Sequence, residues 1–108
     1  MEIFKQLTRI FDAGDDDERI VREAAEGQDV DFERLGEAYW RLYRATYRLP
    51  KIWKAMSPAQ KEGVYRERRR IRSHFYRFSR AAQDWVAEME PPRPEDWVPP
   101  RRNVEGWD

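Results

Sequence analysis

Two stretches of the chain repeat an apolar residue at alternating steps of three and four positions. This spacing keeps one narrow apolar strip on one side of a helix, because a helical turn takes about 3.6 residues. The first stretch comprises Phe32, Leu35, Tyr39, Leu42, Thr46, Leu49, Trp53 and Met56. The second comprises Val64, Ile71, Phe75, Phe78, Ala82, Trp85 and Met89. The pattern predicts two long helices whose strips are buried against each other or against a partner.

Composition limits the class of protein. A chain of 108 residues corresponds to one domain, and its 14% of aromatic residues supply large side chains for a core despite 39% of charged ones. The absence of cysteine excludes disulfides and thiolate metal sites. No apolar run reaches the length of a membrane span, and the N-terminus lacks the pattern of a signal peptide. We therefore expect a cytoplasmic protein with no contact to a membrane.

Local signals predict two short helices near the N-terminus. An apolar stripe indicates a helix at residues 2–12, which Gly14 ends. The acidic run Asp15–Glu18 suits the start of a second helix, where the backbone dipole is positive, and Gly27 suits its end.

The two long helices have their own boundary signals. With Asp31 as N-cap, the first of them is expected to run to about Leu49, and Pro50 either stops it or kinks it before a short continuation through Met56. Ser57-Pro58-Ala59-Gln60 is a capping box with proline at the first helical position, so the second is expected to run from there to about Glu90.

These signals together predict an all-α fold. The turn around Ser57 makes the two long helices an antiparallel hairpin, which one or two N-terminal helices complete into a small bundle over residues 1–90. Residues 91–108 hold five of the seven prolines and are expected to form an extended tail, packed on the bundle or on a partner. The narrow strips also suit a homodimer, since a second copy can cover them as well.

Charge is strongly partitioned along the chain although the net charge is zero. Residues 1–33 carry four basic and eleven acidic side chains, and residues 34–80 carry fourteen basic and three acidic ones. The last segment, residues 81–108, is acidic again, with three basic and seven acidic side chains. The basic middle segment is a candidate contact for an acidic partner.

Within that segment, one side of the predicted long helix is rich in arginine. We call this surface the arginine face, and its members are Arg66, Arg69, Arg70, Tyr76, Arg77 and Arg80. Regularly spaced guanidinium groups with an aromatic ring suit a phosphate backbone, or an acidic protein. The alternative is a solvated helix face, neutralised in part by the acidic N-terminal segment.

Aromatic residues outside the strips are candidates for a protein interface. They are Trp40, Tyr43, Tyr47, Trp97 and Trp107. The first three would be left in water by a two-helix hairpin unless the N-terminal helices cover them. The two tail tryptophans either fold back onto the bundle or serve as anchors for another protein.

Three further features have structural and functional interpretations. Arg68 falls inside the apolar strip, where it either reaches solvent, pairs with an acid such as Glu37, or marks a strip that opens to a partner. The run Asp15–Glu18 is expected to cap a helix, with Mg²⁺ or Ca²⁺ binding and reversible covering of the arginine face as alternatives. His74 is the only histidine, and we expect it to serve packing.

The sequence offers no set of residues for catalysis. A single histidine and no cysteine leave no nucleophilic triad, and the isolated glycines form no phosphate loop. We therefore expect no enzyme, no cofactor and no metal site. The leading hypothesis is a small non-catalytic protein-binding module, such as an adaptor, an assembly factor or an inhibitor of a larger complex. The alternative is a nucleic-acid-binding protein that uses the arginine face.

Overall fold

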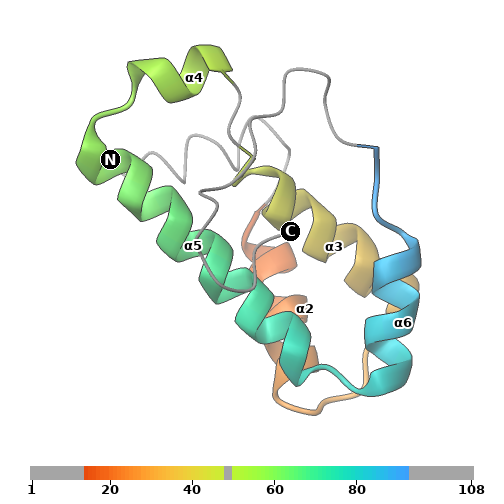
Figure 1. Cartoon of the computed structure of the whole chain (residues 1–108). Helices are drawn as coiled ribbons and strands as arrows, with labels where there is room; N and C mark the ends of the chain where they lie inside the picture. Colours follow the sequence, from red (N-terminus) through yellow and green to blue (C-terminus); the bar gives the residue numbers. More distant parts are fainter. Residues whose placement is uncertain (1–13, 48–49, 93–108) are drawn as a thin grey trace.

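The computed structural model describes residues 14–47 and 50–92. Within these residues the chain forms five α-helices and no strand, which confirms the predicted all-α class (Figure 1). The helices are α2 (Asp15–Ala25), α3 (Phe32–Arg44), α4 (Pro50–Ala55), α5 (Pro58–Arg77) and α6 (Arg80–Glu88). The helix expected at residues 2–12, and the expected tail beyond residue 92, lie outside the described residues.

Helix α2 has the predicted boundaries. Its first turn is the acidic run Asp15–Glu18, and the Oδ2 atom of Asp17 accepts a hydrogen bond from the backbone N–H of Gly14 at 3.3 Å. Gly27 follows the helix with a φ of 89°, a conformation that glycine adopts without a steric penalty. Its N–H donates to the carbonyl of Ala24 at 3.1 Å, so a free carbonyl at the helix end is satisfied.

Helix α3 begins as predicted and ends early. The Oδ1 atom of its N-cap residue, Asp31, accepts the N–H of Glu33 at 3.1 Å. The helix stops at Arg44 instead of near Leu49, and Pro50 is the first residue of α4 instead of a kink within one helix. Proline suits a first helical position because it has no N–H to satisfy, and it disfavours the helical conformation in the residue before it.

The capping box at the start of α5 is confirmed. The hydroxyl of Ser57 accepts the N–H of Gln60 at 3.2 Å, and the N–H of Ser57 donates to the side-chain carbonyl of Gln60 at 2.8 Å. These reciprocal bonds satisfy two donors at the helix start. The helix therefore begins at Pro58, the position that the sequence indicates.

The prediction that this helix continues to Glu90 is wrong. Phe78 and Ser79 both have a ψ of 157°, so the backbone is extended between α5 and α6. The hydroxyl of Ser79 accepts the N–H of Ala82 at 3.2 Å and caps α6. The side-chain amide of Gln83 donates to the carbonyls of Tyr76 and Phe78 at 3.2 and 3.1 Å, which satisfies the end of α5.

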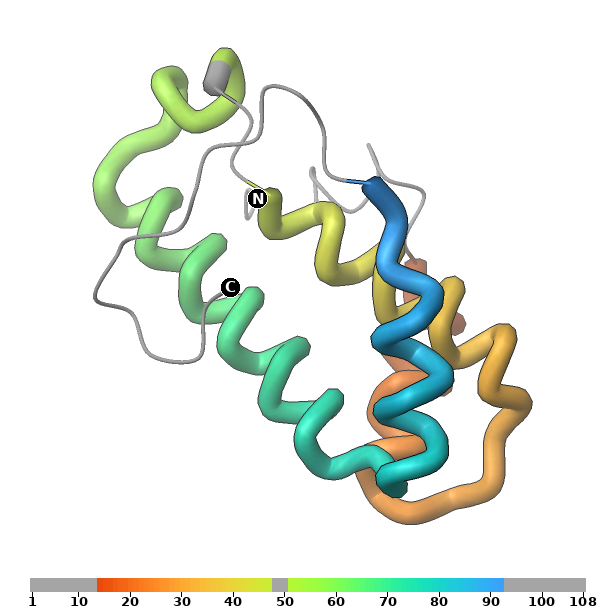
Figure 2. The backbone as a smooth tube through the Cα atoms, turned by 45° about the vertical axis from the view of Figure 1, so that its right-hand side comes forward, coloured from red at the N-terminus to blue at the C-terminus, as the bar shows by residue number. Residues whose placement is uncertain are grey.

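Helix α3 lies at the centre of the fold. Helices α2 and α6 pack along it, and α5 contacts both α2 and α3. Helices α3 and α5 run in roughly opposite directions, while α6 turns back beside α3 (Figures 1 and 2). The contacts of α3 with α2 and α6 are more extensive than those with α5, so the expected hairpin partner is not its main neighbour.

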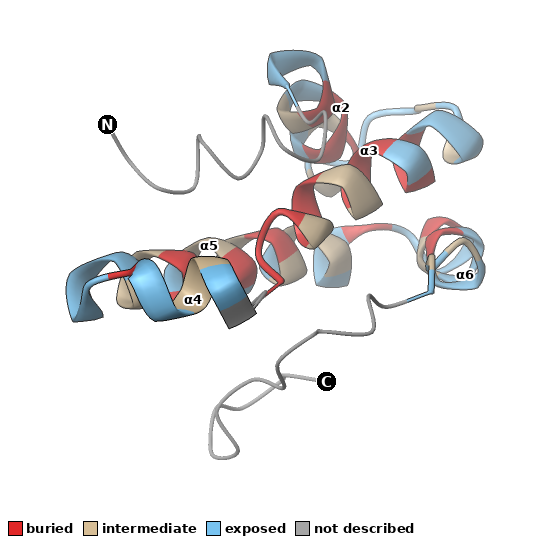
Figure 3. Cartoon of the chain, turned by 90° about the horizontal axis from the view of Figure 1, so that it is seen from above, coloured by how far each residue is buried: buried red, intermediate tan, exposed pale blue. Residues whose placement is uncertain are grey.

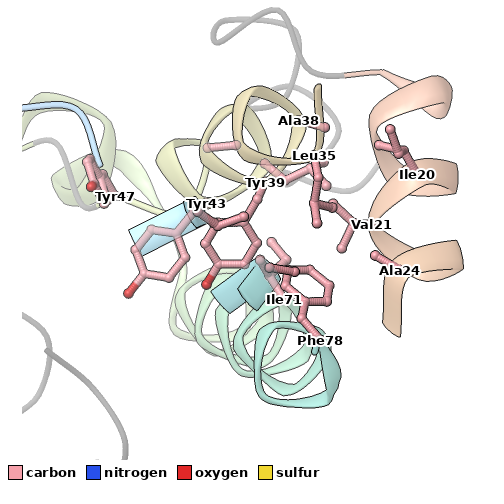
Figure 4. Close-up of a cluster of buried hydrophobic side chains, with 14 of the residues drawn as sticks. Ile20, Val21, Ala24, Leu35, Ala38, Tyr39, Tyr43, Tyr47, Ile71 and Phe78 are labelled. Carbon is pink, nitrogen blue, oxygen red and sulfur yellow. The ribbon is translucent and has the colours of Figure 1, made fainter. Parts of the chain in front are cut away.

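The core lies where these four helices meet. Viewed from above, buried residues line the sides of the helices that face one another (Figure 3). The ring of Tyr39 lies 5.4 Å from the ring of Phe75 and 6.1 Å from that of Phe78, and Ile71 and Leu35 beside it are fully buried (Figure 4). Burial of such large apolar groups is the main source of stability in a domain of this size.

The apolar strip of residues 64–89 coincides only in part with the buried surface. Ile71, Phe78 and Ala82 are buried, but Trp85 is 51% exposed and Val86 is buried instead. Within α6 the buried residues Ala82 and Val86 are four positions apart, whereas the repeat counts three positions from Ala82 to Trp85, which lies on the exposed side. The strip prediction therefore fails at Trp85.

Candidate functional site

The arginine face lies on the outer side of α5, with one member turned inward. Arg66, Arg69 and Arg77 are exposed, and Tyr76 is 58% exposed. Arg80 is also exposed but is the first residue of α6, so it does not continue the row along α5.

Arg70 is the inward member and joins α5 to α2. Its Nη2 and Nη1 atoms donate to the two carboxylate oxygens of Glu18 at 2.8 and 3.2 Å, and its Nε atom donates to Glu67 at 2.9 Å. Burial by itself lowers the pKa of Arg70, but the hydrogen bonds and charges of Glu18 and Glu67 outweigh it and raise the pKa above its ordinary value. The acidic N-terminal segment therefore neutralises part of the basic segment within the same chain.

Other arginines of this face have looser partners. Arg69 lies 3.9 Å from a carboxylate oxygen of Glu62, and Arg80 lies 3.3 Å from one of Asp84. Within residues 14–47 and 50–92, Arg66 and Arg77 form no ion pair. Exposed pairs of this kind contribute little to stability and give way to a stronger anion. The face thus retains its charge in its outer row and loses it at Arg70.

His74 lies beside this cluster, half-buried on α5. Its Nε2 atom is 3.5 Å from Nη1 of Arg70, and its Nδ1 atom is buried. Burial lowers the pKa of His74, and the positive charge of Arg70 lowers it further, since both disfavour the imidazolium form.

This shift predicts a loss of stability on acidification. The unfolded chain takes up a proton at His74 near its ordinary pKa of about 6.5, whereas the folded chain does so only at lower pH. At a pH between the pKa of His74 in the folded chain and its pKa in the unfolded chain, the unfolded state holds more protons. The stability of the fold therefore decreases as the pH falls through this range. Among the neighbouring charges, Glu18 opposes the effect while Arg70, Arg77 and Arg22 add to it. Between pH 7.5 and 5.5, the melting temperature of the His74→Gln variant is expected to fall by less than that of the wild type. Equal decreases in the two proteins, measured by thermal unfolding, would contradict this prediction.

The predicted aromatic interface on α3 is largely internal. Tyr43 and Tyr47 are 1% and 2% exposed, and their rings lie 5.7 Å apart in an edge-to-face arrangement. Trp40 is half-buried, and its indole N–H donates to the carbonyl of Val86 at 2.7 Å, which fixes α6 to α3. The two tyrosines are therefore packed in the core, and their contact with a partner stays a prediction. Trp97 and Trp107 lie outside the described residues.

Arg68 is buried in the core instead of reaching solvent. It is 1% exposed, and its Nε and Nη2 atoms donate to the hydroxyl and carbonyl oxygens of Thr46 at 3.1 and 3.0 Å. The guanidinium lies over the rings of Tyr43 and Tyr47, with centroid distances of 5.2 and 5.8 Å. Glu37 is exposed, so the pairing considered from the sequence is not formed. Arg68 stabilises the end of α3, where its charge also suits the helix dipole.

Within residues 14–47 and 50–92, the most exposed large apolar group apart from Tyr76 is Trp85, on the outer side of α6. Its ring lies 6.3 Å from that of Phe32 at the start of α3. A cavity of about 340 Å³ beside it is lined by Glu33, Trp85, Glu88 and Met89. The sequence does not indicate a site at Trp85, because the apolar repeat places this residue in the core.

A second cavity shares Met89 with the first. Its volume is about 220 Å³, and the residues that line it are Gly36, Glu37, Trp40, Arg41, Arg44, Met89 and Pro91. Gly36 is a buried residue of α3, and a Cβ atom there would clash with the sulfur of Met89, so glycine permits the close approach of the two segments. We call the two adjoining cavities the Trp85 groove.

The acidic run Asp15–Glu18 has structural partners. Both oxygens of Asp17 accept hydrogen bonds from Arg41 at 2.8 Å, and Glu18 binds Arg70. Over residues 14–47 and 50–92, no group of three or more histidine, cysteine or acidic side chains is arranged to hold a metal ion. No helix in that part of the chain is both long enough and apolar enough to cross a membrane.

Comparison of the chain with protein-family models, with curated proteins and with solved structures gave no match.

Proposed function

We propose that this chain is a small non-catalytic protein-binding module that contacts its partner through the Trp85 groove. The observation that carries the proposal is the half-exposed indole of Trp85 beside a groove between α3 and α6. A half-exposed tryptophan keeps part of its apolar surface in contact with water, which is unfavourable unless another molecule covers that surface. Tryptophan is also the residue most enriched among those that dominate binding energy at protein interfaces.

The ion pairs of the arginine face favour this function over nucleic-acid binding. Arg70 is held by two carboxylates, so a phosphate would compete with acidic groups of the same chain at this position. At the groove, Trp85 is 51% exposed, so its ring is accessible to a partner.

The proposal is tested by using the immobilised full chain to retain proteins from an extract. A partner is expected to be retained by the wild type and by Tyr76→Ala, which removes the other large exposed aromatic group of the described part of the chain. Retention by Trp85→Ala is expected to fall at least tenfold, since truncation of a central interface tryptophan costs about 2 kcal/mol or more. Retention of the same protein by Trp85→Ala, or failure to retain any protein, would contradict the proposal.

Nucleic-acid binding is a second candidate because Arg66, Arg69 and Arg77 share the outer side of α5 with the exposed ring of Tyr76. If this face binds phosphates, fluorescence anisotropy with labelled single-stranded DNA, duplex DNA and RNA will show affinity that weakens steeply between about 50 and 200 mM salt.

The triple variant Arg66→Glu, Arg69→Glu and Arg77→Glu is then expected to abolish this binding. It spares Arg70, whose reversal would break the contact with α2. The matched control reverses exposed cations on α2, α3 and α4, namely Arg19, Arg34 and Lys54, and is expected to bind within about threefold of the wild type. Equal losses in both triple variants would indicate an effect of net charge and not of the arginine face.

A further inference from the structure

The first part of the Trp85 groove is acidic as well as apolar, whereas Arg41 and Arg44 lie among the residues that line its second part. Glu33 and Glu88 line its first part and Glu37 its second part, and all three side chains are exposed. Within the described residues none of these carboxylates forms an ion pair. The carboxylates of α2 behave differently, since Asp17 and Glu18 are held by arginines of neighbouring helices.

The position of Glu88 adds to the negative electrostatic potential of the groove. It is the last residue of α6, and the last turn of this helix contains no basic residue. A carboxylate at a helix C-terminus is unfavourable, because it adds to the partial negative charge of the free carbonyl groups there. The carboxylate of Glu88 therefore does not stabilise α6. A cation bound in the groove would offset its unfavourable interaction with the end of the helix.

The ring of Trp85 determines which cation fits. A guanidinium or ammonium group over an indole face is attracted by the ring, and its alkyl stem covers apolar surface. The planar guanidinium also stacks on the ring and can bind a carboxylate through two hydrogen bonds. Bare metal ions would gain nothing from Trp85 and Met89, which supply no oxygen ligand.

We propose that the Trp85 groove docks an arginine-bearing basic segment of another protein. The proposal rests on the proposed function, in that it names the chemistry of the partner at the same surface. Charge complementarity at the first part of the groove selects the occupant: an acidic segment there would be repelled by Glu33 and Glu88, and a purely apolar one would bury them without a partner.

The experiment follows the indole N–H signals of the five tryptophans in the full chain by two-dimensional NMR during titration with a hexa-arginine peptide. The signal of Trp85 is assigned by its absence in Trp85→Phe. This signal is expected to shift saturably with hexa-arginine and not with a hexa-glutamate peptide. The signal of Trp40, whose N–H is held by Val86, is expected to shift less.

A matched pair of variants distinguishes binding in the groove from general electrostatic attraction of the peptide to the chain. The variant Glu33→Gln, Glu37→Gln and Glu88→Gln is expected to weaken binding about tenfold. The control Asp16→Asn, Glu26→Gln and Asp29→Asn changes the net charge equally at exposed positions in and after α2, and is expected to bind within about twofold of the wild type. Equal weakening in both variants, or no shift of the Trp85 signal, would overturn the proposal.

Three outcomes distinguish between this inference and the proposed function. If a partner is retained through Trp85 while hexa-arginine neither binds nor competes with it, the partner's chemistry is different and the inference fails alone. If sedimentation shows a dimer that dissociates in Trp85→Ala, the occupant is a second copy of this chain, which also overturns docking of another protein's segment. If hexa-arginine binds but no protein is retained, the groove has the inferred chemistry and the proposed function fails.

Discussion

Replacement of Arg68 with alanine is expected to lower the free energy of unfolding by about 3 kcal/mol. The side chain is 1% exposed and donates to both oxygens of Thr46. Its removal leaves the buried carbonyl of Thr46 without this donor and opens a space between α5 and the rings of Tyr43 and Tyr47. Both the lost hydrogen bonds and the cavity contribute to the expected cost.

The neighbouring arginine provides the control for this prediction. Arg69 is exposed on the outer side of the same helix, and Arg69→Ala is expected to change stability by less than about 0.5 kcal/mol. Arg68→Lys keeps the charge but loses the planar donor arrangement, so its cost is expected to lie between the two. Urea unfolding followed by circular dichroism measures all three. If Arg68→Ala unfolds at the same urea concentration as Arg69→Ala, Arg68 does not stabilise the core in this way.

Helix boundaries set by local hydrogen bonds could be predicted from the sequence. Asp31, the Ser57–Gln60 capping box and Gly27 each act within four residues, so the residue types themselves indicate the geometry. The same holds for the exposure of Arg66, Arg69 and Arg77, because they lie opposite the apolar strip of α5.

The end of α5 could not be predicted from the apolar repeat. The repeat passes through Phe78 and Ala82 without interruption, and both are buried, so it gives no sign of the extended residues between them. The signal that was available is Ser79, a residue type typical of an N-cap, followed by Gln83 that binds the end of α5. Because the apolar repeat is much longer than this N-cap signal, it led to the prediction of one continuous helix with Trp85 in the core.

The ion pairs that modify the arginine face depend on tertiary structure. Glu18 and Arg70 are 52 residues apart, and nothing in either local sequence indicates that α2 lies against α5. The partition of charge along the chain indicated attraction between acidic and basic segments, but not which residues would pair. Arg68 is a similar case, because its partner is the backbone and hydroxyl of Thr46 and not a carboxylate.

The second large effect is expected at the contact between α2 and α3. Asp17 is 8% exposed, and its two oxygens accept hydrogen bonds from Nε and Nη2 of Arg41 at 2.8 Å each. Two charge-assisted hydrogen bonds in this geometry are among the strongest that a side chain forms. Because Arg41 is half-exposed and can be rehydrated, Asp17→Ala is expected to cost about 2 kcal/mol of unfolding free energy.

A double-mutant cycle with Arg41→Ala isolates this contact from the other roles of the two residues. The coupling energy is expected to be about 1–2 kcal/mol, and the exposed neighbour Asp16, changed to alanine, serves as the control with a cost below about 0.5 kcal/mol. Additive effects of Asp17→Ala and Arg41→Ala would contradict the predicted coupling. Arg41 also lines the Trp85 groove, so a measured coupling would mean that α2 holds one wall of the proposed binding surface in place.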